Sequence, residues 1–198
     1  PEVPFTGVFD GCGHKISNYH INMTTTKSNG LFANIGAAAE IKNVGISDVT
    51  AELVKDEWEM ICGGLVGTMT GASRVENCYA KNVEIKTNYD GGRFQSGGGI
   101  VGKALEEATI ENCYALNIKF INDVNFDAGV IGNTGSHGVT IKNCYSDYTV
   151  SCYRAPKLIE NVINSYYVTK APWPWVCDFN NQSKNEWYGY IGQKVDAD

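Results

Sequence analysis

The residues that most often carry catalytic chemistry are sparse in this sequence and do not fall into catalytic motifs. The three histidines, His14, His20 and His137, form no His-Glu-x-x-His pair, the spacing that lets two rings on one helix face hold a catalytic zinc ion. No serine lies in the Gly-x-Ser-x-Gly context of a hydrolase nucleophile. We therefore predict that this chain is not an enzyme and has no catalytic residues, which leaves the activity of any longer parent protein open.

Carboxylates at repeated positions are a second place where chemistry could reside, because glycosidases use paired acids around one bond. Glu76 and Glu111 occupy equivalent positions, and Lys42 and Lys142 stand in the same column. No second acidic column lies two residues away. A column of mixed sign is typical of a solvated outer surface, so we expect these side chains to face water.

Cysteine is the third candidate, with seven in the chain. Cys78, Cys113 and Cys144 each follow an asparagine at one repeated position. If the repeats stack, these side chains stand in parallel about 4.8 Å apart, a poor approach for a disulfide. A collinear column also cannot surround a metal ion tetrahedrally. We expect three reduced, mostly buried thiols, whereas the pairing of Cys152 and Cys177 stays open.

These positions belong to a tandem repeat with a period of about 31 to 35 residues. One block is Val75-Glu-Asn77-Cys-Tyr79 with its counterparts, and an upstream block is Gly64-Leu-Val-Gly67 with its counterparts. In a third block apolar residues alternate by two, as at Val83 and Ile85. This alternation indicates strands rather than the helices of ankyrin or tetratricopeptide repeats.

Short strands of this kind cannot bury a face alone, so the units must stack around one continuous core. The sequence predicts an all-β protein: a right-handed parallel β-helix, or solenoid, of about five to six coils with three strands each, over residues 1–170. The 22 glycines, 11 tyrosines and only 19 % charged residues agree with turns and stacked strands.

An asparagine column falls at a corner between two of the predicted strands. Its members are Asn18, Asn43, Asn77, Asn112, Asn143 and Asn164. Side-chain amides that stack in register can hydrogen-bond from one coil to the next. We predict a structural ladder in which Asn43, Asn77, Asn112 and Asn143 form the regular part.

Residues 171–198 match nothing in the repeat and carry Trp173, Trp175 and Trp187. A solenoid exposes open strand edges at its ends, and an irregular apolar segment over such an end prevents association between edges. We predict an irregular aromatic C-terminal cap, with a linker as the alternative. End-to-end self-association through an uncapped terminus stays open.

The connections from the third strand of one unit to the first strand of the next must cluster along one edge of the solenoid. They contain aromatic and acidic side chains, and we name as a candidate ligand-binding edge Trp58, Tyr89, Asp90, Phe94, Asp123 and Phe126. Rings stack on sugar faces while carboxylates take hydroxyl groups, so a glycan is the expected ligand. The alternative is that the rings fold back over strand ends. No cofactor is predicted, although the acids in these connections could bind calcium without an EF-hand spacing.

Charge and hydropathy limit the partners. The formal net charge of −6 and the absence of a basic cluster argue against nucleic acid. No run of 18 apolar residues exists, so we expect no membrane insertion in this fragment. The chain begins inside a motif and without a signal peptide, so we expect a fragment of a larger protein.

The repeats resemble the GLUG motif, named for a Gly-Leu-hydrophobic-Gly core such as Gly64-Leu-Val-Gly67, over roughly residues 5–170. The opening segment from Phe5 to Ile16 is similar to the one that precedes such repeats in bacterial surface proteins. The resemblance implies a non-catalytic, extracellular or cell-surface module of a larger secreted bacterial protein. The repeats are similar to those of bacterial adhesins and to non-catalytic regions of immunoglobulin A peptidases. The resemblance implies that the partner is a host or cell-surface glycan or protein. A carbohydrate-binding or polysaccharide-degrading β-helix protein is the alternative.

Overall fold

The computed structural model describes residues 3–23, 27–53, 59–86, 94–121, 126–135, 138–148, 151–153, 161–167, 189–191 and 193–194. All regular structure in these ranges is β-strand. No helix in the described part of the chain is long and apolar enough to cross a membrane.

The strands form four sheets, which we number in the order that the chain visits them within one turn, beginning at the Gly-Leu-Val-Gly block. Sheet I comprises β4 (Phe32–Ile35), β8 (Val66–Met69), β12 (Val101–Ala104), β16 (Ile131–Thr134), β19 (Ser151–Tyr153) and β22 (Gly189–Ile191). Sheet II comprises β1 (Val8–Asp10), β5 (Glu40–Lys42), β9 (Arg74–Glu76), β13 (Thr109–Glu111), β17 (Thr140–Lys142) and β20 (Asn161–Ile163).

Sheets III and IV complete the turn. Sheet III comprises β2 (Lys15–Met23), β6 (Gly45–Leu53), β10 (Tyr79–Lys86), β14 (Tyr114–Ile121), β18 (Tyr145–Ser146), β21 (Tyr166–Tyr167) and β23 (Gln193–Lys194). Sheet IV comprises β3 (Ser28–Asn29), β7 (Glu59–Gly63), β11 (Phe94–Gly98) and β15 (Phe126–Ala128).

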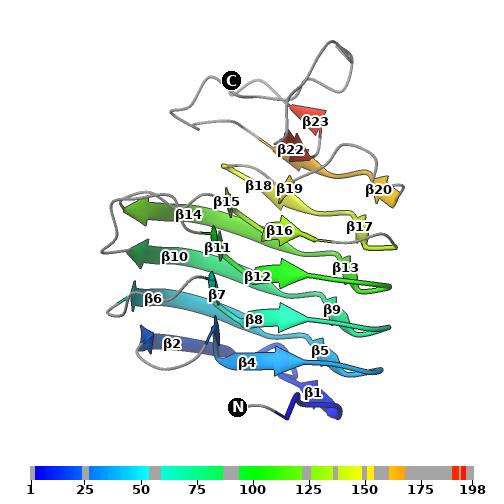
Figure 1. Cartoon of the computed structure of the whole chain (residues 1–198), viewed down its shortest axis with the longest axis horizontal. Helices are drawn as coiled ribbons and strands as arrows, with labels where there is room; N and C mark the ends of the chain where they lie inside the picture. The colour runs from blue at the N-terminus through cyan, green and yellow to red at the C-terminus, as the bar shows by residue number, and fades with distance from the viewer. Residues whose placement is uncertain are drawn as a thin grey trace.

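The four sheets stack as a β-solenoid, which confirms the predicted all-β parallel architecture (Figure 1). Three turns carry a strand in every sheet: β4 to β7, β8 to β11, and β12 to β15. Incomplete turns flank them at both ends. Strands β4, β8, β12 and β16, which follow the Gly-Leu-Val-Gly block and its counterparts, pair in parallel in that order, as a parallel β-helix requires.

The prediction of three strands per coil is wrong, because the connections that we expected to be loops contribute sheet IV. In the second turn, Met60, Ile61 and Cys62 of β7 are buried, and Ile61 pairs with Ser96 of β11. Because three consecutive residues are buried, apolar and polar residues do not alternate along β7. A strand buried on both sides carries no period-two signal, which is why the sequence reading missed it.

Glycine makes the tight turn between sheets IV and I possible. A Cβ atom on Gly63 would lie 1.9 Å from the Val66 carbonyl oxygen, and one on Gly98 would lie 1.9 Å from the Val101 oxygen. Backbone cannot move aside as a side chain can. The repeated glycines therefore let β7 and β11 lie directly against β8 and β12.

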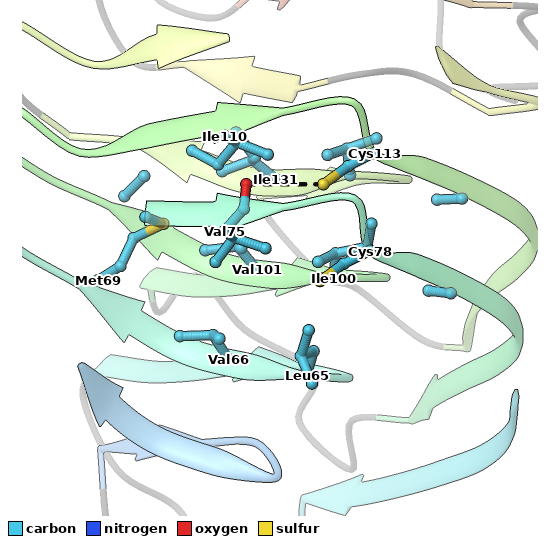
Figure 2. Close-up of a cluster of buried hydrophobic side chains, with 14 of the residues drawn as sticks. Leu65, Val66, Met69, Val75, Cys78, Ile100, Val101, Ile110, Cys113 and Ile131 are labelled. Atoms are coloured by element: carbon cyan, nitrogen blue, oxygen red, sulfur yellow. Dashed lines mark hydrogen bonds between the residues drawn. The ribbon is translucent and has the colours of Figure 1, made fainter. Parts of the chain in front are cut away.

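The core is a set of aliphatic columns that run through the solenoid. Val75 and Ile110 of sheet II face Val66 and Val101 of sheet I, and all four are fully buried (Figure 2). Strands β5, β9, β13 and β17 share one pattern, with the central residue buried and both neighbours partly exposed. This pattern is the period-two alternation on which the strand prediction rested.

At the C-terminal end the parallel order stops in sheet I. Strand β22 pairs antiparallel with β19, whereas β23 pairs parallel with β21 in sheet III. Of the predicted cap at 171–198, the described residues are those of these two strands, and the three tryptophans lie outside them.

Candidate functional site

The predicted ligand-binding edge falls largely outside the described residues. Trp58, Tyr89, Asp90 and Asp123 lie there, and of Phe94 and Phe126 the backbone alone is described. Phe94 begins β11 and Phe126 begins β15, its neighbour in sheet IV, while β7 begins at the residue after Trp58. The backbone thus brings the ends of three connections to one edge of sheet IV. Calcium binding at Asp90 and Asp123 stays a prediction.

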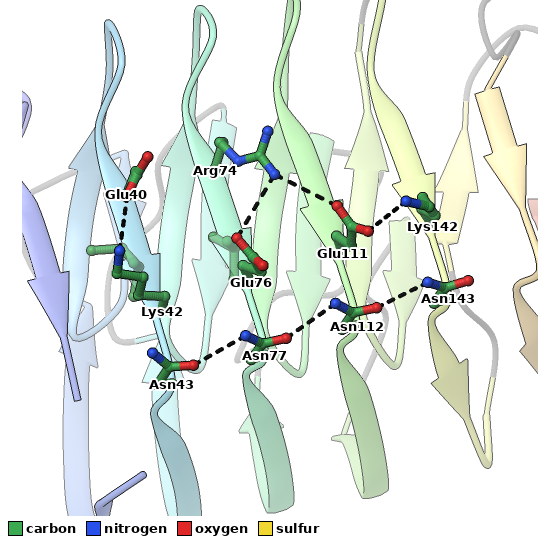
Figure 3. Close-up of polar contacts among 12 residues, drawn as sticks. Glu40, Lys42, Asn43, Arg74, Glu76, Asn77, Glu111, Asn112, Lys142 and Asn143 are labelled. Carbon is green, nitrogen blue, oxygen red and sulfur yellow. Dashed lines mark hydrogen bonds and ion pairs between the residues drawn. The ribbon is translucent and has the colours of Figure 1, made fainter. Parts of the chain in front are cut away.

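The asparagine column forms a continuous hydrogen-bonded ladder at the corner between sheets II and III (Figure 3). The amide nitrogen of Asn77 donates to Asn43 over 3.0 Å, Asn112 donates to Asn77 over 3.1 Å, and Asn143 donates to Asn112 over 2.9 Å. Asn164 donates to Asn143 over 3.4 Å. Every amide points its nitrogen toward the N-terminal end of the solenoid, so the ladder has a direction.

A carboxylate ends this ladder. Asn43 donates to Asp10 Oδ1 over 3.0 Å, and the Cys12 backbone N–H donates to the same oxygen over 2.9 Å. These two donors hold the pKa of Asp10 below its usual value. A carboxylate has no hydrogen to pass on, so the chain of donors stops at the first turn.

The ladder asparagines also turn the corner. Asn43, Asn77, Asn112 and Asn143 have φ between 52° and 54°, in the left-handed region. Asparagine enters this region more easily than other residues that carry a Cβ atom. One residue type therefore supplies both the backbone turn and the amide, and the same position cannot be filled by a branched aliphatic residue.

A second ladder lies in sheet III, and the sequence reading missed it. Asn117 donates to Asn82 and Asn82 donates to Asp48, each over 2.8 Å. These two donors and Asp48 again have positive φ. The signal was present in the sequence, because each residue lies five positions after a member of the first column.

The placement of Asn18 in the first column is wrong. Strand β2 pairs Ser17 with Ser47 and Tyr19 with Val49, which puts Asn18 level with Asp48 in the second column. Its amide nitrogen contacts Ser17 Oγ at 3.3 Å. The corner from Asp10 to Lys15 is two residues longer than the equivalent corner from Lys42 to Gly45. The match of Ile16-Ser-Asn18 to the repeated Ile-x-Asn block is therefore out of register.

A tyrosine column lies between the two ladders on the outer face of sheet III. Its members are Tyr79, Tyr114, Tyr145 and Tyr166, which share one register. The rings of Tyr79 and Tyr114 stack with centroids 5.1 Å apart and planes 7° apart. The Tyr79 ring lies over Gly45, where a Cβ atom would come within 2.0 Å of it. Ring faces that cover each other and the backbone are not free to stack on a sugar.

An ionic row runs along sheet II beside the first ladder (Figure 3). Glu76 and Glu111 are register neighbours, and Arg74 bridges them at 3.7 and 3.5 Å. Lys142 donates to Glu111 over 2.6 Å. The hydrogen bond from Lys142, together with the charges of Lys142 and Arg74, lowers the pKa of Glu111. The predicted solvated column is thus half-exposed, and its charges are paired with each other.

The three repeated cysteines are free and buried, as predicted. Each thiol donates to a backbone carbonyl two residues before it, as Cys113 does to Glu111 over 3.1 Å. Cys113 also contacts the Val75 carbonyl at 3.7 Å (Figure 2). Burial raises the pKa of the Cys113 thiol well above its usual value, so the proton stays on sulfur. The column behaves as small core residues that satisfy strand carbonyls.

The buried acid Asp127 is hydrogen-bonded to Tyr148, which follows β18. Asp127 of β15 is buried and accepts a hydrogen bond of 2.6 Å from the Tyr148 hydroxyl. Burial raises the pKa of this carboxyl group, and the bond from Tyr148 offsets part of the rise. The Tyr148 ring packs on Phe120 of sheet III. The pair joins sheets III and IV near the last complete turn.

Within the described ranges, no three His, Cys, Asp or Glu side chains are grouped so that they could hold a metal ion. The ladder asparagines and the ionic row bond along the solenoid axis to residues of neighbouring turns. Comparison with known protein families, curated proteins and solved structures returns no match for this chain.

Proposed function

We propose that this chain is a non-catalytic surface module, an adhesin-like repeat domain of a larger secreted bacterial protein. One observation supports this most: the two asparagine ladders and the ionic row join side chains of successive turns along sheets II and III, as a rigid scaffold requires. Extracellular or cell-surface location rests on the resemblance of Gly64-Leu-Val-Gly67 and its counterparts to the GLUG motif.

The binding role falls to the end of sheet IV at which β7, β11 and β15 begin side by side, directly after the connections that carry Trp58, Phe94 and Phe126. Strand faces repeat the same residue types in each turn, whereas these connections vary in length and composition. Variable segments on a rigid scaffold are where specificity is usually found. The partner is a host or cell-surface glycan or protein.

A glycan array and a panel of immobilised cell-surface proteins, probed with the whole purified chain, test this function. We expect saturable binding that Trp58→Ala together with Phe94→Ala weakens at least about tenfold while the melting temperature changes little. Tyr145→Ala is the matched control, because it removes an exposed ring of sheet III. Equal loss in the control and the double variant, or collapse of the fold in the double variant, contradicts the proposed edge.

The alternative is a carbohydrate-binding or polysaccharide-degrading protein, which the aromatic and acidic residues of the connections before β7, β11 and β15 favour. Release of reducing ends from a polysaccharide panel separates the two functions. The enzyme is favoured if highly purified protein still hydrolyses a polysaccharide and if substitution of Asp90 or Asp123 abolishes this hydrolysis. Binding without product supports the adhesin-like module.

We also propose that the incomplete turns bring the solenoid to five to six coils and that residues 171–198 cap its C-terminal end. The antiparallel pairing of β22 with β19 supports the cap, since an antiparallel strand cannot continue a parallel coil. Deletion of residues 171–198 should lower the melting temperature and promote aggregation. A truncated chain that is as stable and soluble as the whole chain contradicts the cap.

A further inference from the structure

The turn that follows β15 is shorter than the three complete turns. Strand β14 has eight residues, whereas β18, its neighbour in the next turn, has two, which pair with Tyr114 and Ala115. Strand β15 lies at the end of sheet IV, with β11 on its other side. Within the described ranges, the second half of β14 and the whole of β15 therefore have no strand paired on their C-terminal sides (Figure 1). This gap lies inside the chain, because β19, β20 and β21 follow it.

Two residues, Asp147 and Tyr148, cross this gap, and we call them the strap. The Asp147 N–H donates to the Ala115 carbonyl oxygen over 3.3 Å, and Asp147 Oδ2 accepts the Asn117 backbone N–H over 2.9 Å. This carboxylate takes the bond that a strand carbonyl would otherwise accept. The Tyr148 N–H then donates to Ser146 Oγ over 3.0 Å, so the backbone leaves the strand at this point.

The Tyr148 side chain joins the strap to both strands. Its ring packs on Phe120, near the end of β14, with centroids 5.6 Å apart. Its hydroxyl donates to Asp127 Oδ2 of β15 over 2.6 Å. One side chain thus bridges the two strands whose edges the short turn leaves open. The hydrogen bond to sheet IV depends on a single carboxyl group.

Asp127 is not part of the repeat. At the same register position, β11 has Gly97 and β7 has Cys62. Among the buried residues of the described part of the chain, Asp127 is the one with an ionisable acidic or basic side chain other than cysteine. The other turns form without a charge at this position. The carboxyl group therefore has a role that is specific to this turn.

The ionised form of Asp127 is poorly satisfied where it lies. A carboxylate offers about four lone-pair sites. The donors that act on Asp127 are its own backbone N–H and the Tyr148 hydroxyl. A buried charge with so few donors costs free energy, which the neutral acid does not. Burial accordingly raises the pKa of this group.

No cation compensates this charge in the described surroundings. Strands β11, β16 and β19 pack against β15 and contain no lysine, arginine, histidine or further acid. Their titratable residues are Cys152 and Tyr153 of β19. Lys119 of β14 is exposed, and Asp147 of the strap has the same sign of charge as ionised Asp127. Ionisation of Asp127 therefore weakens the contact that holds the strap closed.

We propose that Asp147 and Tyr148 form a pH-sensitive strap, which is closed while Asp127 is neutral and is released when Asp127 ionises. The contribution of Asp127 to closure is present below its unfolded pKa and is lost as pH rises through the raised folded pKa. Release frees the C-terminal sides of β14 and β15. Because β15 begins at Phe126, release would also loosen the proposed binding end of sheet IV, and this consequence alone rests on the proposed function.

Hydrogen exchange of the Asn117 amide, followed by NMR on the whole chain, tests the strap without a ligand, because Asp147 covers this N–H. After correction for intrinsic exchange, its protection factor should fall at least about threefold between about pH 4 and pH 8. Asn82 holds the same position one turn earlier, where β14 pairs with its strand. The Asn82 amide is therefore the internal reference for global opening, and its protection should not follow the same curve.

Three variants locate the titrating group. Asp127→Asn should remove the pH dependence, and Asp147→Asn should keep it. Tyr148→Phe unlinks the strap from Asp127, so it should lower the protection of the Asn117 amide at every pH and remove the dependence. Protection that is constant across the pH range, or a dependence that survives in folded Asp127→Asn or Tyr148→Phe, overturns the proposal. These outcomes do not depend on whether the glycan and protein panels show binding.

Discussion

At the scale of single residues, the ladder asparagines show how one side chain can serve two purposes. Each adopts a left-handed backbone conformation at a corner and carries an amide into a chain of hydrogen bonds. Asn77, Asn112 and Asn143 are exposed. When a ladder asparagine is replaced by alanine, its former partners can therefore hydrogen-bond to water. The loss of folding free energy is smaller than for a buried amide.

We predict that Asn77→Ala lowers the free energy of unfolding more than Asn164→Ala does. Asn77 bonds in both directions, whereas Asn164 bonds to Asn143 alone among the described residues. Each lost bond should cost about 0.5 to 1.5 kcal/mol, and alanine at positive φ adds about 1 kcal/mol at both positions. Chemical denaturation measures the difference. Asn77→Gly removes the backbone term, so equal midpoints for Asn77→Gly and the wild type would mean that the bonds contribute nothing.

The buried Asp127 leads to a prediction about pH. Burial raises its folded-state pKa above the usual value of about 3.9, so ionisation opposes folding. The contribution of this group to stability is present below the unfolded pKa and is lost as pH rises through the folded pKa. Asp127→Asn keeps an oxygen for the Tyr148 hydroxyl and has no charge to bury.

We therefore expect Asp127→Asn to be at least as stable as the wild type at pH 7, and to lose this advantage as pH falls toward the unfolded pKa. Urea denaturation at several pH values checks the sign. Tyr148→Phe is the control, because it removes the donor and should destabilise by about 1 to 3 kcal/mol at pH 7. A wild type that is more stable than Asp127→Asn at pH 7 would contradict the argument.

At the scale of elements, the turn between sheets IV and I depends on glycine. The glycine before it must let one strand lie against the next without a Cβ atom between them. At Gly98 the nearest atoms to such a Cβ are backbone, at 1.9 Å and 2.7 Å. At Gly135 the nearest are the ends of the Leu105 and Lys103 side chains, at 2.7 Å and 3.1 Å.

Gly98→Ala should destabilise by about 3 kcal/mol or more, since strands β11, β12 and β16 must separate to admit a methyl group. Gly135→Ala should cost less than about 1 kcal/mol, because flexible side chains can move aside. Both values come from chemical denaturation of otherwise identical protein. Similar costs at the two positions would show that the turn is looser than its geometry indicates.

At the scale of the whole molecule, the solenoid has a direction and two unlike ends. Both ladders point their amide nitrogens toward the N-terminal end and stop at carboxylates, the first at Asp10 in the first turn and the second at Asp48 one turn later. The N-terminal turn substitutes aromatic residues for aliphatic ones, and an antiparallel strand ends sheet I at the other pole. Interior turns can share one set of residues because each packs between two similar turns, whereas a terminal turn has a neighbour on one side only and differs in sequence.

The rates of thiol labelling can report local opening of the solenoid core. Cys12 is exposed, whereas Cys62, Cys78, Cys113 and Cys144 are buried, and burial raises the pKa of the Cys62 thiol to about 12. In native protein, a maleimide should therefore modify Cys12 at least about 100-fold faster than the four buried thiols, which react through opening. Peptide mapping by mass spectrometry identifies the sites. A disulfide among these five, or fast modification of Cys113, would contradict the closed core.

The sequence by itself determined the parallel solenoid, the register of its regular turns and the ladder from Asn43 to Asn143, because a fixed period of apolar and asparagine positions leaves few other ways to bury a core. The tertiary structure decided what periodicity does not encode. Strand β7 is buried on both sides and has no alternation, so sheet IV emerged only when the turns were stacked. The offset of Asn18 depends on the length of the first turn, and the stacked rings of Tyr79 and Tyr114 depend on the space over Gly45. These features arise from contacts between turns, which no single repeat contains.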